Sequence, residues 1–585
     1  MTTVIGSDSD WAGKPVQNPE QPTLQTIHLK SEEQIGLEAN SILALVGPNN
    51  SGKSYFIKQL RAILYGRSIA SASIDRGLIK SVEVRWPTGD LRSYLRQVAE
   101  SNFKDAGTHY DPELPYSVYG NSPLINKENF SRWDSPFNRF GVFIETFVRF
   151  DEPLSRITES DRKSLEDYGN AIVKLRDQKD AYDAVREAFK YIFNEEIHFH
   201  FHEGKLTFFL GPRPQEMPSI ADANSANVIE FLKSARTIDQ QGLGMRNVVG
   251  LLMRLYTDSR SVVLIDEPEA FLHPPQAYRL GQVLQRVCQE EKRQIVCATH
   301  DRNLLSGMAR EGSKQLVVHR LSYKGDVVNQ YSSTNVQPDA FEDIRAKSRI
   351  RYTPILESLF SAVAVLVENE NDALFFEEAF DNYESGSTVP QAHALNDSII
   401  FIPTNGNGNF ASIADLLRRL RTPTLIVGDL DLISEKKRLL NTVSVMGRHK
   451  YSEVDSLAAA IWDRFREVYS AEFEGISKQN SEGKLKSRIA KDIEADHKNG
   501  EIRRLVEELL KSLASIGILL LPVGELEDFD RSLFDSGDKN VWARKAIDSK
   551  VYENEAVLSF CADVASAASR VINVDEDASY KLPSC

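Results

Sequence analysis

The stretch SILALVGPNNSGKS, residues 41–54, decides how the first part of the chain folds. It begins with an apolar run of strand type and ends with GPNNSGKS, which fits the pattern G-x-x-x-x-G-K-[ST] at every fixed position. Apolar residues then recur at helical spacing from Ile57 to Leu64. A strand, a glycine-rich turn and a helix in this order predict a phosphate-binding loop.

The residue types of this loop suit the phosphates of a nucleotide. Glycines permit a tight turn whose N–H groups face inward, and the helix that follows aims its positive end at the same anion. Lys53 is expected to reach the β and γ phosphates, and the Ser54 hydroxyl is expected to ligate Mg2+. The nucleotide-binding residues expected here are Gly47, Asn49, Asn50, Ser51, Gly52, Lys53 and Ser54.

A second strand that ends in carboxylates is expected in SVVLIDEPEAFLHPP, residues 261–275. Asp266 is placed to hold Mg2+ through water, and Glu267 to orient or deprotonate the attacking water. The alternative is that these two acids cap the next helix. A further apolar strand, residues 294–300, ends at His300, which can donate a hydrogen bond to the γ phosphate.

Together these segments resemble the ABC-type ATPase heads of the SMC-like group. The resemblance rests on the loop at Gly47, IDEPE at 265–269, LHP at 272–274 and TH at 299–300, which occur in the order typical of that group. It implies that the chain binds and hydrolyses ATP. It also implies that two copies close over the nucleotide, each supplying a signature segment to the other.

The segment QGLGMR, residues 241–246, stands in the place of that signature segment and lacks its usual serine. A helix is expected after it, over residues 247–256. Gly242 and Gly244 still permit close approach of the backbone to a phosphate at the helix N-terminus, so they join the expected nucleotide-binding residues. The missing serine bears on the rate of hydrolysis more than on the dimer, so ATP binding is the firmer prediction.

Length, charge and apolar patterning narrow the class of protein. A chain of 585 residues should hold two or more domains, because single cores stop growing beyond about 250 to 300 residues. No apolar run approaches the ~18 residues that span a bilayer, and the first residues show no signal pattern, so we expect a cytoplasmic protein without a membrane partner. The net charge of −14 argues against general polyanion binding, yet it allows a local basic groove or metals that bridge carboxylates to phosphate.

Acids follow three strand-like runs in the last part of the chain. The runs are residues 362–367, 424–427 and 516–523. The acids are Glu368, Asp372, Asp429, Asp431 and Glu527. Open α/β sheets build their sites at the carboxyl ends of parallel strands, and a set of carboxylates alone favours Mg2+ or Mn2+ over zinc. The alternative is that the acids cap helices and pair with basic side chains.

This pattern resembles a Toprim domain. Glu368 with Asp372 matches its glutamate motif, and Asp429 with Asp431 matches its D-x-D motif. The sequence departs from the family in two places: Asn369 replaces the usual glycine, and residues 405–409 lack the lysine often found near the middle glycines.

An ABC-type head followed by Toprim resembles the OLD (overcoming lysogenization defect) family of ATP-dependent nucleases, which includes Gabija-type and retron-linked defence nucleases. The resemblance implies a DNA endonuclease that uses ATP and Mg2+, with Mn2+ possible at the Toprim site, and that acts in anti-phage defence under control of nucleotide state. The implied catalytic residues are Glu267, His300, Glu368, Asp429 and Asp431. The implied partners are DNA, further copies in a homodimer or higher even oligomer, and an accessory defence protein or a reverse transcriptase with RNA–DNA.

A second function stays open. Asn369 and the missing lysine also suit an ATPase sensor or scaffold whose Toprim-like domain no longer cuts and instead binds a partner effector or toxin.

The expected architecture is α/β, with an ABC-type (SMC-like) P-loop ATPase head before a Toprim-like Rossmannoid domain. The expected boundaries are a loose tail at 1–22, the ATPase at 23–345 with an insertion and a helical arm, and the Toprim-like part at 346–585 with a helical insertion at about 455–512. In IHFHFH, the histidines 198, 200 and 202 share one strand face. We expect them to face outward, although three aligned imidazoles can also bind a metal.

Overall fold

The computed structural model describes residues 21–64, 77–89, 145–148, 175, 179–202, 205–211, 236–257, 260–310, 315–324, 330–336, 340–341, 343–344, 354–386, 399–468, 500–533 and 539–573. The predictions for the tail at 1–20, the insertion at 107–134 and the middle of the helical insertion, 469–499, lie outside these ranges. None of the helices within them combines the length and apolarity needed to span a lipid bilayer.

The chain forms two compact units. One contains residues 1–42, 57–272 and 286–296, and the other contains residues 43–56, 273–285 and 297–585. The expected boundary near residue 345 does not coincide with this division and stays a prediction.

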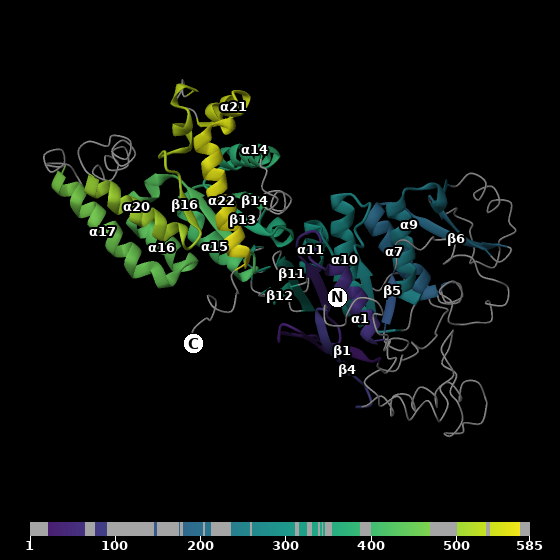
Figure 1. Cartoon of the computed structure of the whole chain (residues 1–585). Helices are drawn as coiled ribbons and strands as arrows, with labels where there is room; N and C mark the ends of the chain where they lie inside the picture. Colours follow the sequence, from purple (N-terminus) through teal and green to yellow (C-terminus); the bar gives the residue numbers. More distant parts are fainter. Residues whose placement is uncertain are drawn as a thin grey trace. The chain divides into compact units, whose positions relative to one another are not determined.

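The largest sheet has six strands in the order β12-β11-β3-β10-β9-β5 (Figure 1). Their bounds are β3 Ile42–Val46, β5 Glu145–Val148, β9 Val262–Asp266, β10 Gln294–Ala298, β11 Leu316–Lys324 and β12 Gln330–Asn335. The two central strands β3 and β10 are buried along their whole length and apolar except for Gln294, as expected for strands covered on both faces. All of the strands predicted around the ATPase motifs are therefore confirmed.

Hydrogen bonds fix the strand directions. The N–H groups of Ile295 and Thr299 donate to the carbonyls of Ser41 and Leu45 at 3.0 and 3.1 Å, so β10 runs parallel to β3. Strand β5 is parallel to β9. Parallel neighbours bring their carboxyl ends to the same edge of a sheet, which is where the predicted motifs follow β3 and β10.

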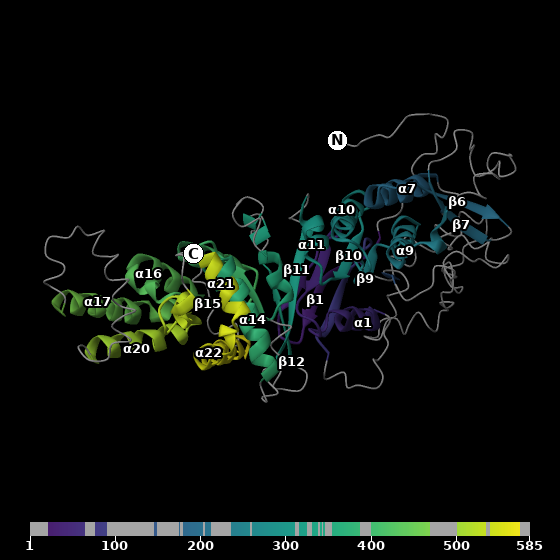
Figure 2. The same cartoon turned by 90° about the horizontal axis from the view of Figure 1, so that it is seen from above.

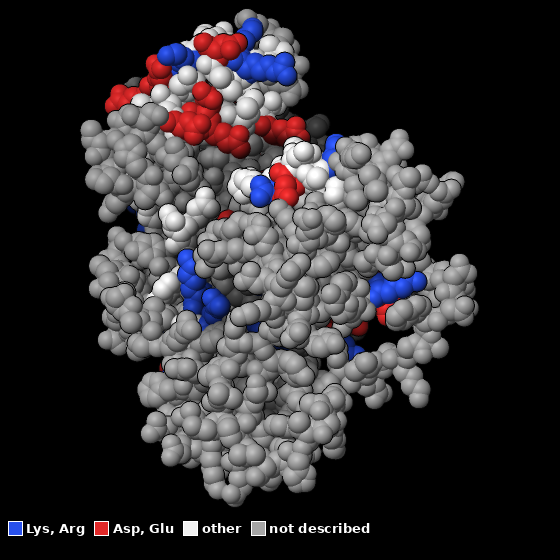
Figure 3. All heavy atoms as spheres, turned by 90° about the vertical axis from the view of Figure 1, so that its right-hand side faces the viewer, with Lys and Arg blue, Asp and Glu red and all other residues white. Residues whose placement is uncertain are grey.

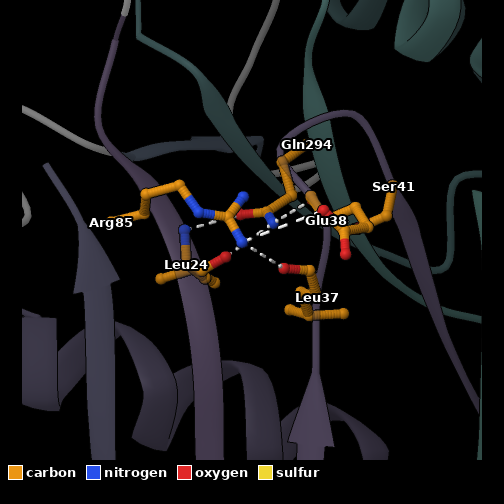
Figure 4. A network of polar contacts seen from close by, with 6 residues as sticks. All are labelled: Leu24, Leu37, Glu38, Ser41, Arg85 and Gln294. Atoms are coloured by element: carbon orange, nitrogen blue, oxygen red, sulfur yellow. Dashed lines mark hydrogen bonds and ion pairs between the residues drawn. The ribbon is translucent and has the colours of Figure 1, made fainter. Parts of the chain in front are cut away.

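A smaller antiparallel sheet, β2-β1-β4, comprises β1 Thr23–Leu29, β2 Gln34–Gly36 and β4 Ile79–Arg85, and β1 and β2 form a hairpin. The fully buried Gln294 ties this sheet to β10 (Figure 4). Its side-chain amide accepts from the N–H of Leu24 at 2.8 Å and donates to the carbonyls of Leu24 and Glu38 at 2.9 and 2.8 Å. A buried amide with these three bonds is satisfied and holds the hairpin in place.

The third sheet, β6-β7-β8, packs beside helix α7, Lys179–Phe193. Its strands are β6 Ile197–His202, β7 Lys205–Leu210 and β8 Arg236–Thr237. His198 is 2% exposed, and its Nε2 lies 3.1 Å from the carbonyl oxygen of Gly211. The prediction that the histidines face outward is wrong for His198, because its ring is buried between the hairpin and the chain that leaves it.

The C-terminal sheet has four parallel strands in the order β14-β13-β15-β16. They are β13 Val363–Val367, β14 Ile399–Pro403, β15 Thr424–Gly428 and β16 Ile518–Leu520. Alternate residues of β13 pack into an apolar cluster with helices α14 Glu370–Gly386, α21 Lys539–Asp548 and α22 Glu555–Asn573. Helix α15, Phe410–Arg419, contacts β13 and β15. The parallel α/β pattern expected here is confirmed.

Three helices lie in and just before the predicted helical insertion at about 455–512, which stays a prediction. After α16, Lys436–Met446, comes α17, Tyr451–Val468, which lies beside α20, Gly500–Ala514, in both views (Figure 2). The cysteines 288, 297 and 561 are buried.

Candidate functional sites

The loop between β3 and helix α1, Lys53–Leu64, has a backbone that its glycines make possible. Gly47, Asn50 and Gly52 all have positive φ angles, of 143°, 62° and 93°. A Cβ on Gly47 would lie 2.0 Å from the carbonyl oxygen of Leu321, so no larger residue fits there. The strand, loop and helix predicted from residues 41–54 are confirmed.

The side chain of Lys53 lies over this loop. It is 7% exposed, and its Nζ donates to the carbonyl oxygens of Gly47 and Pro48 at 2.8 Å each. Helix α1 begins at Lys53, so the positive end of the helix dipole and the ammonium group lie beside the same loop. This is the arrangement of charge that an anion at a helix N-terminus requires.

The acids after β9 do not cap a helix. Asp266 is the last residue of the strand and Glu267 follows it, whereas the next helix, α10, begins at Pro274. Glu267 has a φ of 51°, a left-handed conformation that is uncommon for a residue with a side chain. Strained backbone of this kind concentrates at functional sites, because only a surrounding structure that fixes it can hold it.

The predicted signature segment opens helix α9, Leu243–Thr257. A Cβ on Gly244 would lie 2.4 Å from the carbonyl oxygen of Phe271, so this glycine lets the helix pack against the turn after Glu267. A Cβ on Gly242 would meet nothing within 4 Å. Packing explains the glycine at 244, and a role at phosphate stays a prediction for both positions.

His300 stands between two residues that fix the backbone. The Oγ1 of the buried Thr299 accepts from the N–H of Asp301 at 3.0 Å. The Asp301 side chain caps helix α11, Arg302–Ala309, by accepting from the N–H of Leu304 at 2.8 Å. The His300 side chain is exposed, so a rigid backbone presents this ring at the end of β10.

The C-terminal sheet brings three of the predicted acids to one edge. Glu368 follows β13, Asp429 follows β15, and Glu527 lies in the short helix Leu526–Phe529 after β16. Pairing of Leu366 with Ile426 puts Glu368 level with the residue before Asp429, and neighbouring strands lie ~4.8 Å apart. We call Glu368, Asp429 and Glu527 the acid edge.

The loops of this edge are joined by backbone hydrogen bonds. The N–H of Gly406, in the loop after β14, donates to the carbonyl oxygen of Glu368 at 2.7 Å. The N–H of Leu430 donates to the carbonyl oxygen of Gly524 at 2.8 Å. These bonds connect neighbouring strand ends and restrict how far the acids can move apart.

Asp372 has a local structural role. Its carboxylate accepts from the N–H of Asn369 at 3.1 Å, and the Asn369 side chain accepts from the N–H groups of Asn371 and Asp372 at 2.9 and 3.2 Å. The two residues therefore cap the start of α14 reciprocally. Asn369 has no positive φ, so its position does not need the conformational freedom of the glycine that it replaces.

The residues of the acid edge fit a hard divalent cation by their chemistry. They offer only carboxylate oxygens, the donors that Mg2+ and Mn2+ prefer, and Glu527 is 7% exposed, so a bound cation would offset the cost of burying a carboxylate there. Among the described residues, no three His, Cys, Asp or Glu side chains converge closely enough to hold a metal as they stand. The ligand set, including the half-buried Asp431 and the residues Ser54 and Asp266 of the ATPase part, stays a prediction.

Arg438 is a charged residue beside this edge that the sequence alone did not indicate. Arg438 of α16 donates through Nη1 to Oδ1 of Asn407, which lies in the loop after β14, at 2.9 Å. Thirty-one positions separate the two residues, and no linear pattern links them.

Comparison with known proteins finds two family models that match separate segments of the chain. The family described as "Overcoming lysogenization defect protein-like, TOPRIM domain" matches residues 359–431, which include Glu368 and Asp429. The family described as "AAA domain, putative AbiEii toxin, Type IV TA system" matches residues 119–306. The chain resembles the OLD family in its Toprim part. It combines an ATPase domain of the AAA/ABC type with an OLD-like Toprim domain.

Two curated relatives are distant. The chain is 22% identical over 281 residues to the Old nuclease of Escherichia phage P2. The matched region covers 46% of this chain and 43% of that protein. The chain is 24% identical over 443 residues to the OLD nuclease of Thermus scotoductus, which covers 70% of this chain and 81% of that protein. The chain thus spans less than half the length of the phage relative.

Among solved structures, the SMC head bound to the C-winged helix domain of ScpA matches 54% of this chain and 99% of its own, with 13% identity and a TM-score of 0.32.

Proposed function

We propose that this protein is a metal-dependent DNA endonuclease that binds and hydrolyses ATP and cuts according to its nucleotide state. One observation carries the proposal: a complete phosphate-binding loop and three acids at neighbouring parallel strand ends occur in one chain whose residues 359–431 match the OLD-like Toprim family. The two curated relatives are both named as nucleases, which supports the same activity.

In the ATPase part, each proposed residue lies at or just after the end of a strand of the six-stranded sheet. Lys53 and the N–H groups of its loop bind the β and γ phosphates, and Ser54 and Asp266 are the oxygen donors for Mg2+. Glu267 positions the attacking water. His300, exposed at the end of β10, donates to the γ phosphate.

In the Toprim part, Glu368, Asp429 and Glu527 are the residues that would hold Mg2+ or Mn2+, with Asp431 beside them. When bound, such ions supply an activated water on one side of a phosphodiester and stabilise the leaving oxygen on the other. The protein's own contribution is to fix these carboxylates at one edge of the parallel sheet. Asp372, held in the cap of α14, orients the first turn after Glu368.

The test is cleavage of plasmid DNA with Mg2+ or Mn2+, in the presence of ATP, of ADP and of neither nucleotide. We expect Asp429→Ala to abolish cutting and to leave ATP binding intact. The matched control is Asp463→Ala, which removes an exposed acid from α17 and should cut like the wild type. Full cutting by the Asp429 variant would refute the endonuclease.

The finer features of the proposal concern partners and setting. Two copies, or a higher even number, share composite ATP sites, the substrate is DNA, and the protein acts inside the cell in anti-phage defence, with or without an accessory protein. Analytical ultracentrifugation of the Glu267→Gln variant with and without ATP tests the dimer. Phage plating on cells that carry wild type or Asp429→Ala tests defence.

One observation favours a second candidate, an ATPase sensor whose Toprim-like part binds a partner protein. The carboxylate of Asp372 is engaged in capping α14 with Asn369, and this reduces its availability as a metal ligand. That candidate predicts no metal-dependent cutting by the isolated chain and co-purification of a second protein.

A further inference from the structure

A nucleic acid that approaches the acid edge is repelled electrostatically. Its phosphates are negative, the edge is built from carboxylates, and the whole chain carries a net charge of −14. On the face drawn in Figure 3, acidic and basic side chains of the described residues are interspersed near the top. A cation held at the edge itself therefore matters more for binding than the overall charge does.

Arg438 is such a cation. Its Nη1 donates to Oδ1 of Asn407 at 2.9 Å, and its Nε lies 3.6 Å from the place that a Cβ on Gly408 would occupy. Asn407 is 8% exposed and belongs to the loop that bonds to the Glu368 carbonyl through Gly406. The guanidinium is thus anchored on the loop that adjoins the first acid of the edge.

Arg438 is also close in sequence to Asp429, the second acid of the edge. Asp429 is followed directly by the short helix Leu430–Ser434, and α16 begins at Lys436. Glu435, between these helices, forms an ion pair with Arg438. Arg438 therefore lies less than three helical turns along the chain from Asp429 and reaches back to the loop beside Glu368.

The side chain of Arg438 is 51% exposed. A guanidinium has five N–H donors in a fixed planar fork, so the bonds to Asn407 and Glu435 leave donors that face solvent. An exposed fork with one side held in place is the geometry that binds a phosphate through two hydrogen bonds.

We propose that Arg438 binds a backbone phosphate of the nucleic acid presented to the acid edge, with Asn407 positioning its guanidinium. The proposal rests on the endonuclease function and names how that site holds its substrate. Glu435 competes with the phosphate for the same guanidinium, so it limits the affinity.

The test measures binding of fluorescent double-stranded DNA to the full chain in EDTA, across a series of salt concentrations. We expect Arg438→Gln to weaken binding by roughly tenfold or more and to reduce the slope of log K against log salt by about 1. Glu435→Gln should strengthen binding by a few-fold, because it frees the guanidinium.

The matched control is Lys437→Gln, which removes the same charge from the neighbouring exposed residue of α16. We expect it to weaken binding less than threefold. Equal losses in Arg438→Gln and Lys437→Gln would overturn the proposal, because binding would then follow the general field. Arg438→Lys guards against a folding defect: it keeps the salt slope and recovers part of the affinity if the role is phosphate binding.

Cleavage in Mg2+ or Mn2+ separates this proposal from the function on which it rests. Wild type that cuts, together with unchanged binding by Arg438→Gln, refutes the role of Arg438 alone. Wild type that binds DNA without cutting, together with weaker binding by Arg438→Gln, refutes the endonuclease and supports Arg438. Wild type that binds no DNA refutes both.

Discussion

The phosphate-binding loop and the acid edge are assembled from the chain in different ways. The loop is a single segment between β3 and α1, and its lysine bonds to carbonyls only five and six positions away. The acid edge collects Glu368, Asp429 and Glu527 from three strand ends that are far apart in sequence. A site made of one segment is specified by its own backbone, whereas a site made of several depends on the sheet that aligns them.

The largest change in ATP affinity is expected from a substitution in the phosphate-binding loop. Gly47→Ala places a Cβ 2.0 Å from the carbonyl of Leu321, at a φ of 143°, so the loop must move away from β11. We expect ATP affinity, measured by calorimetry, to fall by roughly a hundredfold, since a shift of about 1 Å costs that much in a preorganised site.

Gly211→Ala is the control for this substitution. Gly211 has a φ of 128° but meets nothing within 4 Å, so it carries the strain without the clash. Its ATP affinity should match the wild type. Equal affinity of Gly47→Ala and wild type would show that the loop is not constrained by β11.

A titration tests the strand that supports the loop. Burial lowers the pKa of His319 on β11 to about 4, while Nδ1 lies 2.9 Å from Oδ1 of Asn335 on β12. The unfolded chain takes up this proton below pH 6.5 and the folded chain only near pH 4, so stability is full above pH 6.5 and is lost as the pH falls through this window. The loss amounts to about 3 kcal/mol.

Chemical unfolding of wild type and His319→Gln between pH 7 and pH 4 measures this effect. The variant should lack that part of the pH dependence. The same slope in both proteins would assign the acid sensitivity to other groups.

Strand β13, which ends at the acid edge, is held at its start by hydrogen bonds from Arg320. This guanidinium is 2% exposed and donates to the carbonyls of Ser361 and Ala362, just before β13, at 2.7 and 3.4 Å. Arg320→Met leaves those carbonyls without this donor, and we expect a loss of about 2 kcal/mol in the free energy of unfolding.

Arg504→Met is the matched control, because Arg504 is 68% exposed on α20 and should contribute less than about 0.5 kcal/mol. Similar losses in both variants, measured by urea unfolding, would contradict a special role for Arg320.

The smallest change in stability is expected at Asn369, the residue that follows Glu368. If Asn369 serves as a cap, Asn369→Ala should cost about 1 kcal/mol, and Asn369→Gly only a few tenths. If the position instead needs backbone freedom, glycine should stabilise the chain. Thermal unfolding of the two variants decides between these outcomes.

The two regions also differ in how far the sequence predicted them. The loop, the acids after β9 and the strands that carry both were predictable, because apolar runs and fixed spacing encode them locally. The cap formed by Asn369 and Asp372 and the burial of His198 were missed, because each depends on which partner the fold supplies. The contact of Arg438 with Asn407 was out of reach for the same reason: it joins two loops that only the sheet brings together.

Consecutive residues of β11 serve both regions. The carbonyl of Leu321 abuts Gly47, while the side chain of Arg320 holds the entry to β13. A truncated protein that starts after β11 would keep every acid of the Toprim part but lose the guanidinium that anchors its first strand. Dissecting this protein into separately expressed halves should therefore weaken the downstream half, and a successful excision needs a start point upstream of Leu316.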